Sequence, residues 1–167
     1  MTIPNTLGWD STKWLSDSNA TPITLFRYTS TTSEPSMADL SLHESSSSSL
    51  TGTDYKVPTS RVFDLMYLQF TTSSTTDLGL GIQANTSADT RTSGTLKWSQ
   101  FLEGSSNLHN LAEWYFGGGL HFVADDYILP YDMQDVDRLR WACWGWGVES
   151  DASVSYTHLT LPTIYSV

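Results

Sequence analysis

Short segments of apolar, strand-forming residues recur along the chain about every ten residues, with polar or glycine-rich turns between them. Helical periodicity is weak throughout. Charged residues make up only 16% of the 167 residues, while serine and threonine are abundant. The spacing predicts about six to eight strands and is typical of an antiparallel sandwich or barrel. We therefore expect an all-β fold: an antiparallel β-sandwich, jelly-roll-like, with a Ser/Thr-rich flexible segment near the N-terminus.

The segment 61–72, "RVFDLMYLQFTT", is almost continuously apolar. This pattern predicts a strand covered on both sides, by a second sheet on one face and by a neighbour or partner chain on the other. Strict alternation places Val62, Met66, Leu68 and Phe70 on one face and Phe63, Leu65 and Tyr67 on the other.

Glycines shape the interpretation of two further segments. In 140–149 tryptophan alternates with glycine, so Trp144 and Trp146 share one face of a strand and need a partner surface. The run 117–119, "GGG", lies between two apolar segments and predicts a tight hairpin, because glycine adopts positive φ at no steric cost. The segment 95–104 fits neither the helical nor the strand period and stays ambiguous.

Composition divides the chain into four parts. Residues 1–28 are expected to form an N-terminal arm with a first strand. Residues 29–54 are expected to form a Ser/Thr-rich loop or linker, because such a polar run buries little apolar area. Residues 55–153 carry the predicted sandwich core, and residues 154–167 form a separate tail.

The balance of charge restricts the possible partners. With a formal net charge of −10, the surface repels phosphate, so neither nucleic acid nor an anionic membrane is an expected partner. We find no signal peptide and no apolar run long enough to span a bilayer, so a soluble protein is expected. Cys143 is the only cysteine, which leaves no intramolecular disulfide, and its apolar surroundings indicate a small buried side chain.

The evidence for reaction chemistry is thin. The spacing of His109 and Glu113, with His121 beyond a glycine-rich turn, resembles a fragment of the cupin metal motif, and imidazole plus carboxylate suits Fe, Mn or Zn. The first histidine of that motif falls on Asn107, however, and the second cupin motif has no counterpart. No nucleophile elbow and no phosphate-binding loop are present. We therefore expect no catalytic residue, no cofactor and no enzymatic activity, with metal binding by these three residues as an alternative.

Aromatic side chains are the stronger candidates for function. Tryptophan and tyrosine bury large areas and still offer a polar atom, so they are enriched at protein interfaces. Flat rings on an exposed sheet also suit a carbohydrate ligand. Both hypotheses, a homo-oligomer interface and a glycan-binding surface, rest on the same residues: Trp114, Tyr115, Trp144 and Trp146.

The stretch from Lys56 to Asp151 resembles the small jelly-roll or β-sandwich virion proteins of tailed phages. The resemblance lies in "YKVPTSRVFDLMYLQF", "GGGLHFVADDYIL" and "RLRWACWGWGVES". It implies a non-enzymatic structural protein of a capsid decoration, tail or fibre, located in the virion. The implied partners are further copies of itself, with a homotrimer favoured, and other virion proteins.

The tail Val154–Val167, "VSYTHLTLPTIYSV", resembles something else. Its back-translation is similar to the transposase adapter that is joined to DNA during sequencing-library preparation, followed by an index and a stop codon. We therefore expect a sequence read from assembled environmental DNA, a native C-terminus that differs from this one, and a tail that packs poorly against the domain.

Overall fold

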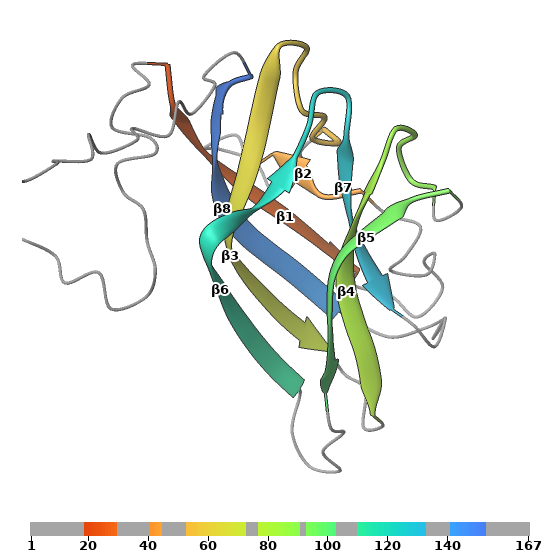
Figure 1. The fold of residues 1–167 in the computed structure, drawn as a ribbon. Helices are drawn as coiled ribbons and strands as arrows, with labels where there is room; N and C mark the ends of the chain where they lie inside the picture. Colours follow the sequence, from red (N-terminus) through yellow and green to blue (C-terminus); the bar gives the residue numbers. More distant parts are fainter. Residues whose placement is uncertain are drawn as a thin grey trace, which may run out of the picture.

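The computed structural model describes residues 19–29, 41–44, 53–72, 77–90, 93–102, 110–132 and 141–152. The tail 154–167 lies outside these residues, and so do most residues of the predicted linker. Eight strands occur in the described part, and they form two antiparallel sheets (Figure 1). The strands are β1 (Thr21–Thr29), β2 (His43–Glu44), β3 (Arg61–Thr72), β4 (Leu78–Asn85), β5 (Thr95–Leu102), β6 (Asn110–Phe122), β7 (Tyr127–Asp132) and β8 (Trp141–Asp151).

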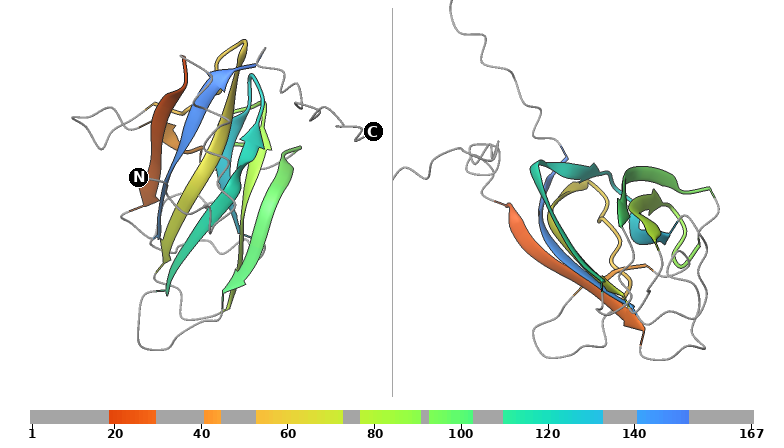
Figure 2. Two further views of the ribbon diagram at one scale, coloured as in Figure 1. Left: turned by 60° about the vertical axis from the view of Figure 1, so that its left-hand side comes forward. Right: turned by 90° about the horizontal axis from the view of Figure 1, so that it is seen from below.

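The strand order defines a jelly roll. The larger sheet has the order β2-β1-β8-β3-β6 and the smaller has the order β5-β4-β7. The first strand pairs with the last, β3 pairs with β6, and β4 pairs with β5. The remaining two strands, β2 and β7, are linked beside β2, where the Leu42 N–H donates to the Ile128 carbonyl of β7 at 2.8 Å. The chain is therefore a long hairpin rolled into two layers (Figure 2), which confirms the predicted all-β, jelly-roll-like sandwich.

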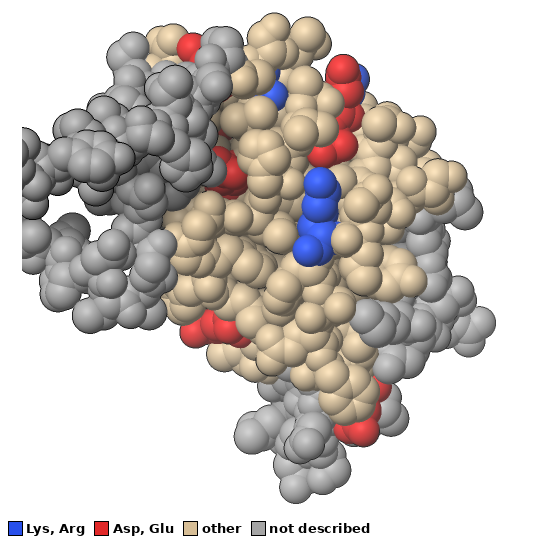
Figure 3. Space-filling view, in the orientation of Figure 1, with Lys and Arg blue, Asp and Glu red and all other residues tan. Residues whose placement is uncertain are grey.

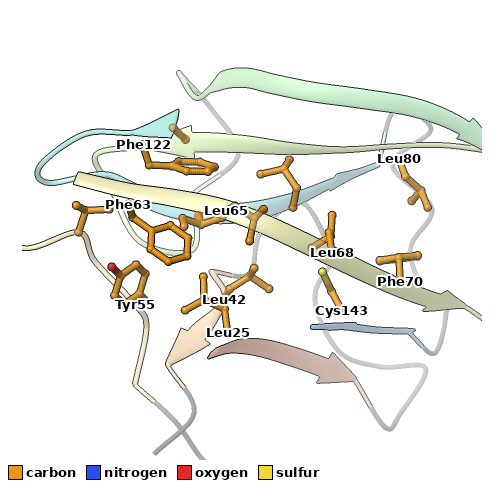
Figure 4. Packing of buried hydrophobic residues seen from close by; sticks show 14 of the residues in the cluster. Leu25, Leu42, Tyr55, Phe63, Leu65, Leu68, Phe70, Leu80, Phe122 and Cys143 are labelled. Carbon is orange, nitrogen blue, oxygen red and sulfur yellow. The ribbon is translucent and has the colours of Figure 1, made fainter. Parts of the chain in front are cut away.

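The core lies between the two sheets and consists of aliphatic and aromatic side chains (Figure 4). Cys143 is buried in it, and burial raises the pKa of its thiol well above the ordinary value. Tyr55 closes one end of the core against Phe63, with ring centroids 5.2 Å apart. The largest fully buried side chains include Phe63, Phe122, Leu25, Leu42, Leu65, Ile82 and Ile128.

The predicted faces of β3 are wrong beyond Leu65, because the strand contains a β-bulge. Leu65 lies opposite Gly147 and Tyr67 lies opposite Trp146, so Met66 has no residue of its own opposite it in β8. One extra residue reverses the side of every residue that follows. Phe63 and Leu65 therefore share the core with Leu68 and Phe70, while Tyr67 and Gln69 face outward.

The predicted hairpin at Gly117–Gly119 is also wrong. β6 runs unbroken through these glycines, and the turn comes later, before β7, which belongs to the other sheet. Tyr115 lies opposite Tyr67 and Leu120 opposite Leu65, so residues 116–119 bulge opposite Met66 alone. Only one of the three glycines has a positive φ, Gly119 at +79°.

The structure adds a strand that the composition did not predict. Within the segment 29–54, residues 29, 41–44, 53 and 54 are described, and Ser41 and Leu42 are fully buried. β2 pairs with β1 at Leu25 and Phe26, and the Tyr55 N–H donates to the Leu42 carbonyl at 2.8 Å. A short apolar anchor in a serine-rich surrounding therefore closes the edge between the two sheets.

Arg61 joins the start of β1 to the end of β8. Its guanidinium donates to Glu149 Oε1 at 2.9 Å, to Asp151 and to the Asn19 carbonyl at 2.7 Å. The Asn19 amide also donates to Asp151 Oδ2 at 2.9 Å. The hydrogen bonds from Asn19 and Arg61 hold the pKa of Asp151 below its usual range.

The described residues contain no helix of the length and apolar character needed to cross a bilayer.

Candidate functional site

The outward face of the larger sheet carries the candidate aromatic residues in two rows across the strands. In one row Tyr115 of β6 lies opposite Tyr67 of β3, which lies opposite Trp146 of β8. The neighbouring row has the same strand order and holds Glu113, Gln69 and Trp144. Because residues opposite one another in a sheet share a face, these six side chains form one surface.

Tyr67 is the centre of this surface. Its ring lies between Tyr115 and Trp144, with centroid distances of 4.8 and 5.0 Å, at angles of 50° and 56°. Tyr67 itself is only 5% exposed, so its ring supports the two outer rings from below. Tilted contacts of this kind are favourable for aromatic pairs and hold the outer rings in place.

A hydrogen-bond network fixes the polar atoms of the same surface. Glu113 Oε1 accepts from the Tyr67 hydroxyl at 3.0 Å and from the Gln69 amide at 2.8 Å. The Trp144 indole N–H donates to the Gln69 carbonyl oxygen. Burial and the hydrogen bond to Glu113 raise the pKa of Tyr67 to about 12. The Trp144 ring is therefore fixed by a hydrogen bond as well as by its contact with Tyr67.

Four large apolar side chains of this face are open to solvent, and we call them the outer-face patch. Tyr28 and Ala142 lie opposite each other on β1 and β8, and Leu111 lies in the same row on β6. The exposed fractions are 46% for Tyr28, 59% for Leu111, 61% for Tyr115 and 40% for Trp144.

The structure separates Trp114 from the other sequence candidates. It lies on the inward face of β6, where its ring contacts Trp98 of β5 with a centroid distance of 4.5 Å. Trp98 also contacts Phe116, at 5.4 Å, and the Trp114 N–H donates to Gln100. We call this contact between the two sheets the tryptophan seam. Trp146 shares the outward face with Tyr115 and Trp144, but it is half-buried.

Two of the three residues of the metal alternative, Glu113 and His121, lie far apart. Glu113 lies opposite Gln69 and His121 lies opposite Asp64, which is five residues away on β3, about 15 Å along the strand. His121 Nδ1 lies 2.9 Å from Oδ1 of the buried Asp64. His109 lies outside the described residues. In the described ranges, no three His, Cys, Asp or Glu residues are grouped to hold a metal ion.

Tyr67 and Gln69 are functional candidates that the sequence interpretation missed. The bulge at Met66 turns both side chains outward, and strict alternation cannot reveal a bulge. The sequence alone could have predicted that Trp114 and Tyr115 lie on different faces, since adjacent residues of a strand point to opposite faces.

No protein-family model matches the chain. No curated protein matches it. Seven chains of solved structures match, and they include the following three. The globular domain of zebrafish complement 1qA protein is 16% identical, with a TM-score of 0.40, covering 75% of this chain and 94% of that chain. A tobacco streak virus coat protein dimer is 14% identical, with a TM-score of 0.33 and coverage of 81% and 88%. A second crystal form of this coat protein is 14% identical, with a TM-score of 0.30 and coverage of 87% and 96%.

These similarities are too low to carry an argument about function. The class of the protein follows from its own strand order and surface. It is a jelly-roll sandwich whose larger sheet exposes an ordered aromatic face.

Proposed function

We propose that the protein is a non-enzymatic assembly module that forms a homotrimer through the outer-face patch and acts as a structural component of a phage virion. One observation carries the proposal. Two large aromatic side chains, Tyr115 and Trp144, stand on either side of the buried ring of Tyr67 on an open sheet face. Exposed apolar patches of this kind mark interaction sites, and tyrosine and tryptophan are typical anchors.

The rigidity of the patch favours a macromolecular partner. Because Tyr67 supports the rings of Tyr115 and Trp144, and Gln69 accepts a hydrogen bond from Trp144, little side-chain entropy is lost when a partner covers these two rings. The sequence resemblance to phage virion proteins supports the choice of a structural partner, and no described group of residues supports a metal site.

The mass in solution tests the assembly. We expect the wild-type protein to sediment at three times the protomer mass. We expect Tyr115→Asp and Trp144→Asp each to raise the dissociation constant of the assembly at least tenfold. Val123→Asp is the matched control, because Val123 is also an exposed apolar residue, 48% exposed, but lies in the turn between β6 and β7. A wild-type protein that stays monomeric at high concentration overturns the assembly proposal.

The virion assignment has its own test in the genes that flank the coding sequence on the source DNA. Capsid and tail genes beside it support a virion component of the decoration, tail or fibre type. A neighbourhood of metabolic genes only, without phage genes, contradicts it.

A glycan ligand is the second candidate, favoured by the carboxylate of Glu113 beside the exposed ring of Tyr115. A sugar needs both a ring face and hydrogen-bonding groups. The rings on either side of Tyr67 are tilted by 50° and 56° to it, however, so the three do not form a flat platform. A glycan array with Tyr115→Ala and Trp144→Ala variants separates the two candidates, with Trp114→Ala as the control from the seam. Wild-type binding that only the first two variants lose supports the glycan ligand.

A further inference from the structure

A second apolar surface lies on the smaller sheet, on the outward face of β5. Leu96 is 46% exposed and Phe101 is 58% exposed. Phe101 lies opposite Gly79, and a Cβ atom built on Gly81 would be 3.0 Å from Leu96 Cδ1, so both side chains share the outward face with these glycines. We call Leu96 and Phe101 the β5 patch.

The two patches lie on either side of one edge of the sandwich. β6 is the last strand of the larger sheet and β5 is the last strand of the smaller sheet. These two edge strands approach each other through the tryptophan seam (Figures 1 and 2). The outer-face patch and the β5 patch are therefore different surfaces that point away from the same edge.

The charges beside the two patches are complementary. Three of the described cations are paired, since Arg27 contacts Asp54, Lys56 contacts Asp125, and Arg61 contacts Glu149 and Asp151. In the same described part, Lys97 of β5 has no carboxylate partner, and its ammonium lies 5.7 Å from the centre of the Phe122 ring.

Glu113 lies on the same outward face as the outer-face patch. Among the described residues, its hydrogen-bond partners are the neutral Tyr67 and Gln69. Figure 3 shows a mainly uncharged described surface, with a basic side chain between β6 and β5.

A contact between the same patches of two copies gains no pairing of opposite charges on this face. If its two-fold axis passed near Glu113, the two Glu113 carboxylates would approach each other. No Lys or Arg side chain from the described strands lies on that face to neutralise them. The formal net charge of −10 on each copy adds to the repulsion.

We infer that the outer-face patch of one copy docks on the β5 patch of a neighbouring copy, with Glu113 facing Lys97 across the contact. This inference rests on the proposed self-assembly and names the surface that completes it. A contact between two different patches is head-to-tail, so it either closes into a ring, which would hold three copies in the proposed homotrimer, or runs on as a filament. Each copy then uses both surfaces, and every contact brings opposite charges together.

A mixing experiment tests the inference. Tyr115→Asp disables only the outer-face patch and Phe101→Asp disables only the β5 patch. Neither variant should form the ring alone. An equimolar mixture should give a heterodimer of twice the protomer mass, because one intact copy of each surface remains. Leu111→Asp and Leu96→Asp, also on exposed side chains, form an independent pair, and near-ultraviolet circular dichroism checks that each variant is folded.

The outcomes separate the inference from the proposed function. If Phe101→Asp stays assembled while Tyr115→Asp dissociates, the contact is patch-to-same-patch, and the head-to-tail arrangement is wrong although self-assembly stands. If both variants dissociate and the mixture stays monomeric, the inference is also wrong. A monomeric wild-type protein would overturn both proposals.

Discussion

A Cβ atom on Gly119 would lie 2.7 Å from the Cβ atom of Asp64, across the β3–β6 pair. Gly119 also has a φ of +79°, a conformation that other residues adopt at a cost. We therefore expect Gly119→Ala to lower the free energy of unfolding by about 2 kcal/mol or more, from backbone strain and the clash together.

Gly118→Ala is the matched control for this prediction. A Cβ atom at Gly118 would meet nothing within 4 Å, and its φ is not positive. The substitution should leave stability unchanged or raise it by up to about 1 kcal/mol, because alanine restricts the unfolded chain. Urea unfolding of both variants checks the pair, and equal effects at the two positions would contradict the bulge.

The salt bridge of Arg61 with Asp151 predicts a pH dependence of stability. The pKa of Asp151 is lowered in the folded state, so its contribution is fully present above the unfolded value of about 3.9. The contribution is lost as the pH falls from there through the folded pKa. The stability difference between wild type and Asp151→Asn should therefore be constant from pH 7 to 5 and shrink towards pH 3. Urea unfolding at each pH measures this stability difference. A difference that grows on acidification would contradict a lowered pKa of Asp151 in the folded state.

Tyr67 predicts a feature at alkaline pH. Its pKa of about 12 means that stability from the hydrogen bond to Glu113 is present below the unfolded value of about 10 and is lost as the pH rises through 12. Tyr67→Phe should cost about 1–2 kcal/mol at pH 7 and remove the absorbance change at 295 nm near pH 12. Tyr28→Phe, on the same face and exposed, should change stability by less than about 0.5 kcal/mol. If Tyr67→Phe instead removed part of the absorbance change at 295 nm near pH 10, the hydrogen bond between Tyr67 and Glu113 would be contradicted.

Trp114 and Trp144 should separate stability from assembly. Trp114→Ala removes the ring contact between Trp98 and Trp114 in the tryptophan seam. This should cost about 2–3 kcal/mol of stability while the variant still assembles. Trp144→Ala removes an exposed ring and should weaken assembly with a smaller loss of stability, about 1 kcal/mol. Chemical unfolding measures the stability of both variants, and sedimentation measures their assembly. A larger loss of stability in Trp144→Ala, or a larger loss of assembly in Trp114→Ala, would contradict these separate roles.

Strong alternation made part of the fold predictable. In β8, Trp144 and Trp146 face outward while Gly145 and Gly147 face the core, as period-two alternation indicates. The glycines are needed there, because a Cβ atom on Gly147 would overlap the Phe63 ring. The all-β class and the sandwich followed from many such segments taken together.

Bulges limited the rest of the prediction. β3 changes face at Met66, and β5 gains an extra residue at Lys97, which lies between the residues opposite Ile82 and Gln83. The second bulge explains why the segment 95–104 matched neither period. A bulge depends on the partner strand, and the partner is set by topology rather than by local sequence. The inclusion of Tyr67 in the candidate site could not be predicted for the same reason.

The pairing of the first strand with the last has a kinetic consequence. Thr21 lies opposite Glu149, and β8 stands between β1 and β3 in the larger sheet. A chain leaving the ribosome cannot complete this sheet until β8 has been synthesised, so β1 and β3 spend that time with unpaired edges. The high contact order of such a fold implies slow folding after synthesis, with strand edges open to aggregation until β8 has paired.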